Sequence, residues 1–176
     1  MLRHAAAAAL LLVALAGQAQ AARPAPQWTG RVTFVSDGDS LWVQPAGVGA
    51  KPVEIRLVDI DAPEICQAWG KQARDALKRM VTGKTVAVQT VTRDRYGRTL
   101  ARITVDGQSV SAWLVQQGHA WSQRSRWDGG PLVTEEQQAK TLRRGLHSQP
   151  AAIQPRDFRR SHGPCVRPAA APGRAK

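Results

Sequence analysis

Carboxylates and arginines gather in three short segments of the chain. The first is Asp37-Gly38-Asp39-Ser40, the second is residues 55–64 (IRLVDIDAPE), and the third is residues 94–98 (DRYGR). Clustered carboxylates are suited to a hard cation such as Ca²⁺, and the planar fork of arginine matches the oxygens of a phosphate. Each segment alone is typical of an ordinary polar turn, because Asp and Gly are common turn residues. Together they predict a cation site that acts on a phosphate-bearing polyanion.

The charge balance agrees with such a site. The 176 residues carry 25 Lys and Arg against 13 Asp and Glu, a formal net charge of +12. Residues 37–64 reverse this balance, with six acids and two bases. A basic protein favours polyanionic partners, either nucleic acid or an anionic membrane surface, and charge alone does not separate the two. A solvated acidic face is the structural alternative for residues 37–64.

The first 21 residues are typical of a secretory signal peptide. A basic residue near the start precedes an apolar run over residues 5–16, and Ala19-Gln20-Ala21 supplies a small-residue cleavage site. We therefore expect an exported protein, periplasmic or secreted, without stable membrane association after cleavage; a retained membrane anchor is the alternative. Without Arg3, the chain has 24 basic and 13 acidic residues, a formal charge of +11.

Two cysteines, Cys66 and Cys165, remain in this expected product. An even number of cysteines in an oxidising compartment allows one disulfide. Two free thiols are the alternative, because the sequence does not give their separation. The hypothesis is a disulfide that ties the arginine-rich end of the chain to the acidic segment.

The chain around these segments alternates between strand and helix patterns. Runs rich in β-branched and aromatic residues predict strands, and apolar residues at helical spacing over 67–82 predict a helix that ends at Gly83. A capping box of Thr134 and Gln137 predicts the start of a last helix, which ends at Gly145. The expected strands are 28–35, 40–44, 53–58, 85–92, 99–105 and the short 108–110, and the expected helices are 67–82, 111–117 and 134–145.

This order predicts one α+β domain that is mostly β. Five strands with an inserted helix fit a five-stranded OB-type barrel with three packed helices. The expected boundaries are a signal peptide at 1–21, a linker at 22–27, the barrel domain at 28–148 and a basic Pro/Ala/Arg-rich tail at 149–176. The last residues of this tail are expected to be disordered.

The three polar segments resemble the D-G-D-[TS], I-R-L-x-x-I-D-A-P-E and D-x-Y-G-R motifs of the staphylococcal nuclease (thermonuclease) family. The likeness extends from about Thr29 to Leu146. It implies the OB barrel with three helices, and calcium-dependent hydrolysis of DNA and RNA that leaves 3′-phosphates. It also implies Ca²⁺ ligands at Asp39, Asp61 and the main-chain carbonyl of Ala62, which replaces the threonine of the founding enzyme.

The resemblance assigns further roles around the phosphate. Glu64 matches the carboxylate that orients or deprotonates the attacking water. Arg56 and Arg98 match two arginines that grip the scissile phosphate. Tyr96 matches a tyrosine near that phosphate, although packing on the barrel explains it nearly as well. A monomer is expected.

Residues 121–127 depart from the family, because substrate-side tyrosines are missing there. Trp121 or Trp127 can stack on a base and Arg124 can bind a phosphate, whereas burial in the core is the alternative for both tryptophans and is favoured for Trp121.

A second hypothesis for the whole chain is a non-catalytic OB-fold module that binds nucleic acid. Such a degenerate domain would have lost some of the acid–arginine set, and all five of its members are present: Asp39, Arg56, Asp61, Glu64 and Arg98.

Overall fold

A computed structural model describes residues 27–125, 127–163 and 165. The expected signal peptide at 1–21 lies outside the described residues, as does all of the linker except Gln27. No helix in the described part of the chain combines the length and apolar character needed to cross a bilayer.

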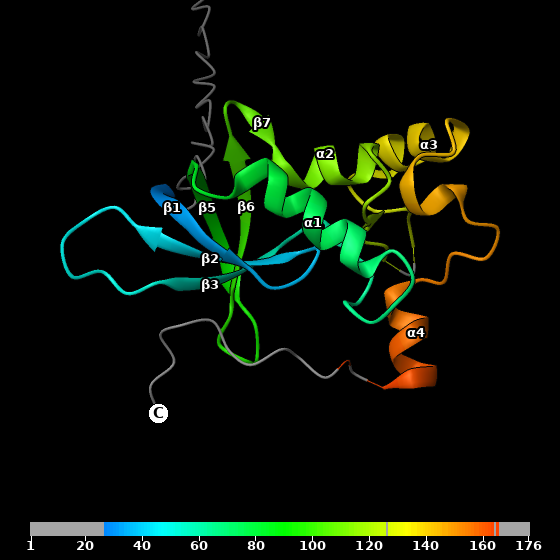
Figure 1. Ribbon diagram of the computed structural model, residues 1–176, viewed down its shortest axis with the longest axis horizontal. Coiled ribbons are helices and arrows are strands. Elements are labelled where there is room, and N and C mark those ends of the chain that lie inside the picture. The colour runs from blue at the N-terminus through cyan, green and yellow to red at the C-terminus, as the bar shows by residue number, and fades with distance from the viewer. Residues whose placement is uncertain (1–26, 126, 164, 166–176) are drawn as a thin grey trace, which may run out of the picture.

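Five strands form a closed barrel, which confirms the predicted OB-type α+β fold (Figure 1). Strands β1, β2 and β3 form an antiparallel meander, β5 pairs with β1, and β6 pairs with β5. The parallel pairing of β3 with β6 closes the barrel. The strands span Gln27–Val35 (β1), Ser40–Pro45 (β2), Val53–Leu57 (β3), Thr85–Arg93 (β5) and Thr99–Val105 (β6).

Alternating apolar residues of these strands fill the barrel. Leu41, Val43 and Ile55 are fully buried, and Val88 has the same environment on β5. Helix α1 (Gly70–Val81) covers the barrel with the apolar stripe that the helical spacing predicted, including Leu77. Burial of this stripe removes apolar surface from water and fixes the helix against the barrel.

The remaining elements of the domain are short. Strand β7 (Gln108–Ser109) leads into α2 (Val110–Gln116), whose first turn is capped by the Ser109 side chain. A second, two-stranded sheet joins β4 (Ile60–Asp61) to β8 (Trp121–Ser122). No sequence pattern predicts this pair, because two residues are too few to show a period.

The capping box predicted at Thr134 is wrong. Helix α3 (Val133–Thr141) begins one residue earlier, with Leu132 at the N-cap and no side-chain cap. Tertiary contacts set this start, because the Leu132 amide donates to the Ser122 hydroxyl at 3.0 Å and Glu136 is buried against Arg124. The chain then leaves the helix at Thr141 and forms a 3₁₀ turn, η1 (Gly145–Ser148).

The basic tail, for which no helix was predicted, contains one, α4 (Pro155–His162). Pro155 occupies its first turn, where a missing amide hydrogen costs nothing. In Figure 1, α4 lies away from α2 and α3, beside the segment that precedes α1. The Gln67 side chain donates to the Ile153 carbonyl there, and Cys165 is bonded to Cys66.

Candidate active site

Neighbouring strands β2 and β3 place the first carboxylate beside the first arginine. Ser40 pairs with Arg56 in the ladder, and Asp39 comes directly before Ser40. The Arg56 guanidinium grips both Asp39 oxygens, with Nη1 at 2.9 Å from Oδ1 and Nη2 at 2.8 Å from Oδ2. Asp39 is almost fully buried, so this two-point ion pair is well shielded from water.

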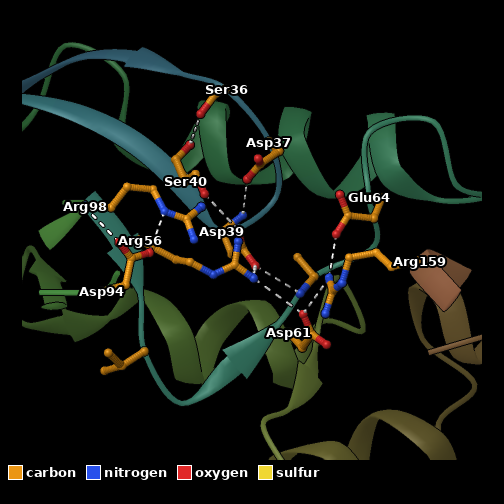
Figure 2. Close-up of polar contacts among 12 residues, drawn as sticks. Ser36, Asp37, Asp39, Ser40, Arg56, Asp61, Glu64, Asp94, Arg98 and Arg159 are labelled. Carbon is orange, nitrogen blue, oxygen red and sulfur yellow. Dashed lines mark hydrogen bonds and ion pairs between the residues drawn. The ribbon is translucent and has the colours of Figure 1, made fainter. Parts of the chain in front are cut away.

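The short strand β4 brings the second carboxylate to the same place (Figure 2). Asp61 Oδ1 lies 3.5 Å from Arg56 Nη2, and the Ala62 amide donates to Asp39 Oδ2 at 3.4 Å. A Cβ at Gly38 would lie 2.8 Å from the Ala62 Cβ, so only glycine lets these two segments approach so closely. The structure thus brings together Asp39, Asp61 and Ala62.

The carboxylates here repel one another. Burial, followed by the charge of Asp39, raises the pKa of Asp37 to about 7. The same two causes raise the pKa of Asp61 to about 6, against the opposing charges of Arg159 and Arg56. The pKa of Arg56 is raised, chiefly by Asp39. Burial and mutual repulsion therefore disfavour the charged forms of Asp37 and Asp61, and a bound cation would oppose both effects.

The donor set fits a hard cation but supplies only part of its coordination. Among the described residues, no group of three or more His, Cys, Asp or Glu is arranged to hold a metal ion. Two carboxylates and one main-chain carbonyl are all oxygen donors, which Ca²⁺ prefers. Because Ca²⁺ takes about six to eight oxygens, water and substrate oxygens would have to complete the shell.

A turn between β5 and β6 supplies the second arginine. The Asp94 carboxylate accepts from Arg98 Nε at 2.7 Å and from the amides of Tyr96 and Arg98. This capped turn orients the Arg98 fork. Tyr96 is largely exposed, with the guanidinium of Arg98 5.6 Å from its ring centroid and that of Arg95 at 4.8 Å.

Two adjoining hollows form one cleft along these side chains. The larger has a volume of about 730 Å³, and the smaller, of about 460 Å³, lies beside it. Asp39, Ala62 and Glu64 line the larger hollow, and Asp61 lines the smaller. The residues common to both hollows are Arg56, Arg95, Tyr96, Arg98 and Arg159.

Arg159 contacts predicted site residues, although it was not singled out from the sequence. Arg159 of α4 donates to Glu64 Oε1 at 2.5 Å and lies 3.6 Å from Asp61 Oδ1. In a tail rich in arginine, nothing in the local pattern distinguishes this one. The available signal was the cysteine pair, because a bond from Cys165 to Cys66 brings the tail within two residues of Glu64.

The structure joins these two cysteines in a disulfide, with the sulfurs 2.00 Å apart. Two expected substrate residues, Arg124 and Trp127, do not line the cleft. Arg124 pairs with the buried Glu136, and Trp121 is buried, which is the alternative favoured for it. Trp127 is highly exposed and lines neither hollow.

An OB-type barrel whose side carries an acid–arginine cleft is suited to binding and cleaving a phosphodiester. Comparison with known proteins agrees with this class. The model of the family described as "Staphylococcal nuclease homologue" matches residues 54–149, more than half of the chain. The matched segment includes Arg56, Asp61, Glu64 and Arg98, and it ends before α4.

Several relatives are similar over most of their length. "Protein ParB" of Escherichia coli is 40% identical over 174 residues, covering 91% of each chain. "Micrococcal nuclease" of Shigella flexneri is 34% identical over 176 residues, covering 91% of this chain and 92% of the relative. An "Uncharacterized endonuclease" of Escherichia coli is 39% identical over 127 residues, covering 72% of this chain and 81% of the relative. The chain belongs to the staphylococcal nuclease family. It is a nuclease, and its substrates are nucleic acids.

Proposed function

We propose that this nuclease is a calcium-dependent endonuclease that hydrolyses both DNA and RNA and leaves 3′-phosphate ends. The observation that carries the proposal is the convergence of three separate segments on one cleft. Asp39 comes from the turn before β2, Arg56, Asp61 and Glu64 come from β3 and the segment after it, and Arg98 comes from the β5–β6 turn. A purely structural ion-pair network would not need to line a cleft of about 730 Å³.

Asp39, Asp61 and the Ala62 carbonyl would hold the calcium ion. When bound, it supplies Lewis-acid polarisation of a phosphate oxygen. The raised pKa values of Asp37 and Asp61 support this assignment, because a cation would offset the burial cost and the repulsion from Asp39 that raise them.

Glu64 is the group that takes the proton of the attacking water in this proposal. It lies three residues beyond Asp61 and borders the larger hollow. The Gln67 side chain accepts from the Glu64 amide at 3.1 Å, which fixes the backbone at this point. A carboxylate held at the edge of the cleft is placed to act as a general base.

Arg56 and Arg98 bind the scissile phosphate and the extra charge that develops when water attacks phosphorus. Arg98 is already oriented by Asp94, and Arg56 by Asp39, so little reorganisation is needed during the reaction. Contacts of this kind recognise the phosphate backbone and carry no sequence information. Cleavage of both DNA and RNA is therefore expected.

Export to the periplasm or the medium, followed by action as a monomer, completes the proposal. The signal-peptide pattern of residues 1–21 supports export. The disulfide between Cys66 and Cys165 is also typical of proteins that act in an oxidising compartment.

Digestion of supercoiled plasmid and of total RNA tests this function. The purified protein is incubated with Ca²⁺, with Mg²⁺ or with EGTA, and the product ends are identified by labelling. We expect cutting of both substrates with Ca²⁺, none with EGTA, and 3′-phosphate with 5′-hydroxyl termini. Cleavage that needs only Mg²⁺ and leaves 5′-phosphates would contradict the proposal.

A further inference from the structure

Helix α4 is fastened to the active-site segment at both of its ends. On its N-terminal side, the Ile153 carbonyl accepts from the Gln67 side chain at 2.5 Å, and Gln67 also holds the Glu64 amide. On its C-terminal side, Cys165 is bonded to Cys66. Both attachments therefore end within three residues of Glu64.

The helix itself buries little of its surface. It has eight residues, of which only Pro155 is buried and Phe158 is half-buried. A helix this short is marginal in water unless tertiary contacts hold it. The two attachments to the segment around Glu64, one of them covalent, act together with the Arg159–Glu64 ion pair to hold α4 at the cleft.

These attachments of α4 position Arg159 at the cleft. Figure 2 shows the arginines in sequence across the site, with Arg98 at one end, Arg56 in the middle and Arg159 at the other end beside Glu64. The Arg159 side chain is 39% exposed, so it borders the open cleft instead of lying in the core. It is also one of the residues that line both hollows.

We propose that Arg159 is a third phosphate-binding arginine, which contacts a phosphate flanking the scissile one, and that the Cys66–Cys165 bond holds it there. The proposal rests on the phosphate-binding roles proposed above for Arg56 and Arg98. A guanidinium has five N–H donors, so the hydrogen bond from Nη1 to Glu64 leaves donors for a phosphate. A nucleic-acid strand that passes from one hollow to the other must run past this side chain.

Two substrates of different length distinguish phosphate binding by Arg159 from the alternative that Arg159 is only a counterion for Glu64. The first is a dinucleotide with a single phosphodiester and no terminal phosphate; the second is a single-stranded DNA octamer. With Ca²⁺ present, Arg159→Ala is expected to raise KM for the octamer about tenfold, the size of one charge-assisted hydrogen bond. KM for the dinucleotide is expected to change little. Because Arg159 also donates to Glu64, any change in kcat is expected to be the same for both substrates.

Arg160→Ala is the matched control. Arg160 is the next residue of the same helix, pairs with Asp157 and lines neither hollow. The substitution removes the same charge from the same helix, and its kinetics are expected to match those of the wild type. Arg159→Lys, which keeps the charge but loses the fork, is expected to lie between the wild type and Arg159→Ala.

Binding in EGTA gives a readout that does not depend on cutting. When a protein neutralises one phosphate fewer on a single strand, the slope of log affinity against log salt becomes shallower by about 0.7. Arg159→Ala should show this change for the octamer, and Arg160→Ala should not.

The role of the disulfide is tested with the double variant Cys66→Ser/Cys165→Ser, whose folding is checked by circular dichroism. This variant is expected to reproduce the higher KM for the octamer, and adding Arg159→Ala to it should produce little further increase. Independent, additive effects would overturn the claim that the bond acts through Arg159.

Two other results would overturn the phosphate-binding role. They are an equal rise in KM for both substrates, and KM values of Arg159→Ala equal to those of Arg160→Ala. Failure of the proposed function has a different signature. In that case the wild type would still cut in EGTA, or Arg56→Lys would cut as fast as the wild type.

Discussion

The two ends of the cleft are built in different ways. At the barrel end, Asp39 and Arg56 belong to or adjoin hydrogen-bonded strands, and the core behind them is fully buried. At the other end, Arg159 sits on a short helix that is attached by one disulfide and a few hydrogen bonds. The geometry of the first end is thus set by the folding of the barrel. The geometry of the second depends on the contacts of this short helix and on the disulfide that follows it.

The largest expected effect lies where the two ends meet, at Glu64. Glu64→Gln keeps the size of the side chain and removes its ability to take a proton. We expect the hydrolysis rate to fall about 10²- to 10⁴-fold, with DNA binding largely retained. Single-turnover cutting with Ca²⁺, together with a binding assay in EGTA, measures both quantities. Full activity in this variant would remove Glu64 from the mechanism.

Arg56→Lys tests the barrel end alone. A lysine cannot grip both oxygens of Asp39 or a phosphate with a planar fork, so we expect cleavage to fall about 10²-fold. The matched control is Arg102→Lys. Arg102 forms the same kind of two-point pair with Asp59, outside the cleft. If both variants slow cleavage equally, the effect belongs to the stability of the barrel and not to the site.

Removal of the disulfide tests whether α4, which carries Arg159, unfolds independently of the barrel. The bond closes a loop with a sequence separation of 99 residues, and the chain-entropy model gives such a loop about 4 kcal/mol of stabilisation. We expect Cys66→Ser/Cys165→Ser to lower the unfolding free energy by about 2–4 kcal/mol. Hydrogen exchange should show reduced protection first in α4. A uniform decrease of protection in the barrel strands would mean that the two ends are one cooperative unit.

The smallest expected effect concerns His119, whose ring contacts Trp69, directly before α1, and Trp113 of α2. Its ring stacks near Trp69 and accepts from the Trp69 indole at 3.2 Å. Burial, with a smaller contribution from Arg79, lowers the pKa of His119. The unfolded chain therefore binds a proton more readily than the folded one, and stability should fall as the pH drops below about 6.5.

The variant His119→Gln isolates this contribution, since it keeps a hydrogen-bond acceptor but does not titrate. Urea unfolding at pH 7.5 and pH 5.5 should show a smaller loss of stability for the variant than for the wild type. An identical loss in both proteins would assign the pH dependence to other groups.

Much of the barrel end could be predicted from the sequence, because its signals are local. Alternating apolar residues set the strands, and the motifs containing Asp39, Asp61 and Arg98 fall at strand ends and turns, which the structure brings together at one cleft. The chemical roles assigned to these three residues remain predictions.

The features that sequence reasoning missed depend on contacts distant in the chain. The pairing of β4 with β8 joins residues about 60 positions apart, and the start of α3 is set by Ser122 and Glu136 and not by a local cap. Arg159 reaches Glu64 across a separation of 95 residues. Such contacts follow from the finished fold and leave no periodic pattern in the sequence.

The disulfide between Cys66 and Cys165 also affects the outcome of proteolysis, because fragments cut within the loop that it closes stay linked. The stretch around Trp127 and Asp128 is exposed and lies inside that loop. Exposed stretches of this kind are where nicking concentrates. A single cut there would leave two polypeptides that still travel as one species on a non-reducing gel and separate only after reduction. A nicked molecule would keep Arg159 linked to the segment that carries Glu64, so damage to the chain need not dismantle the cleft.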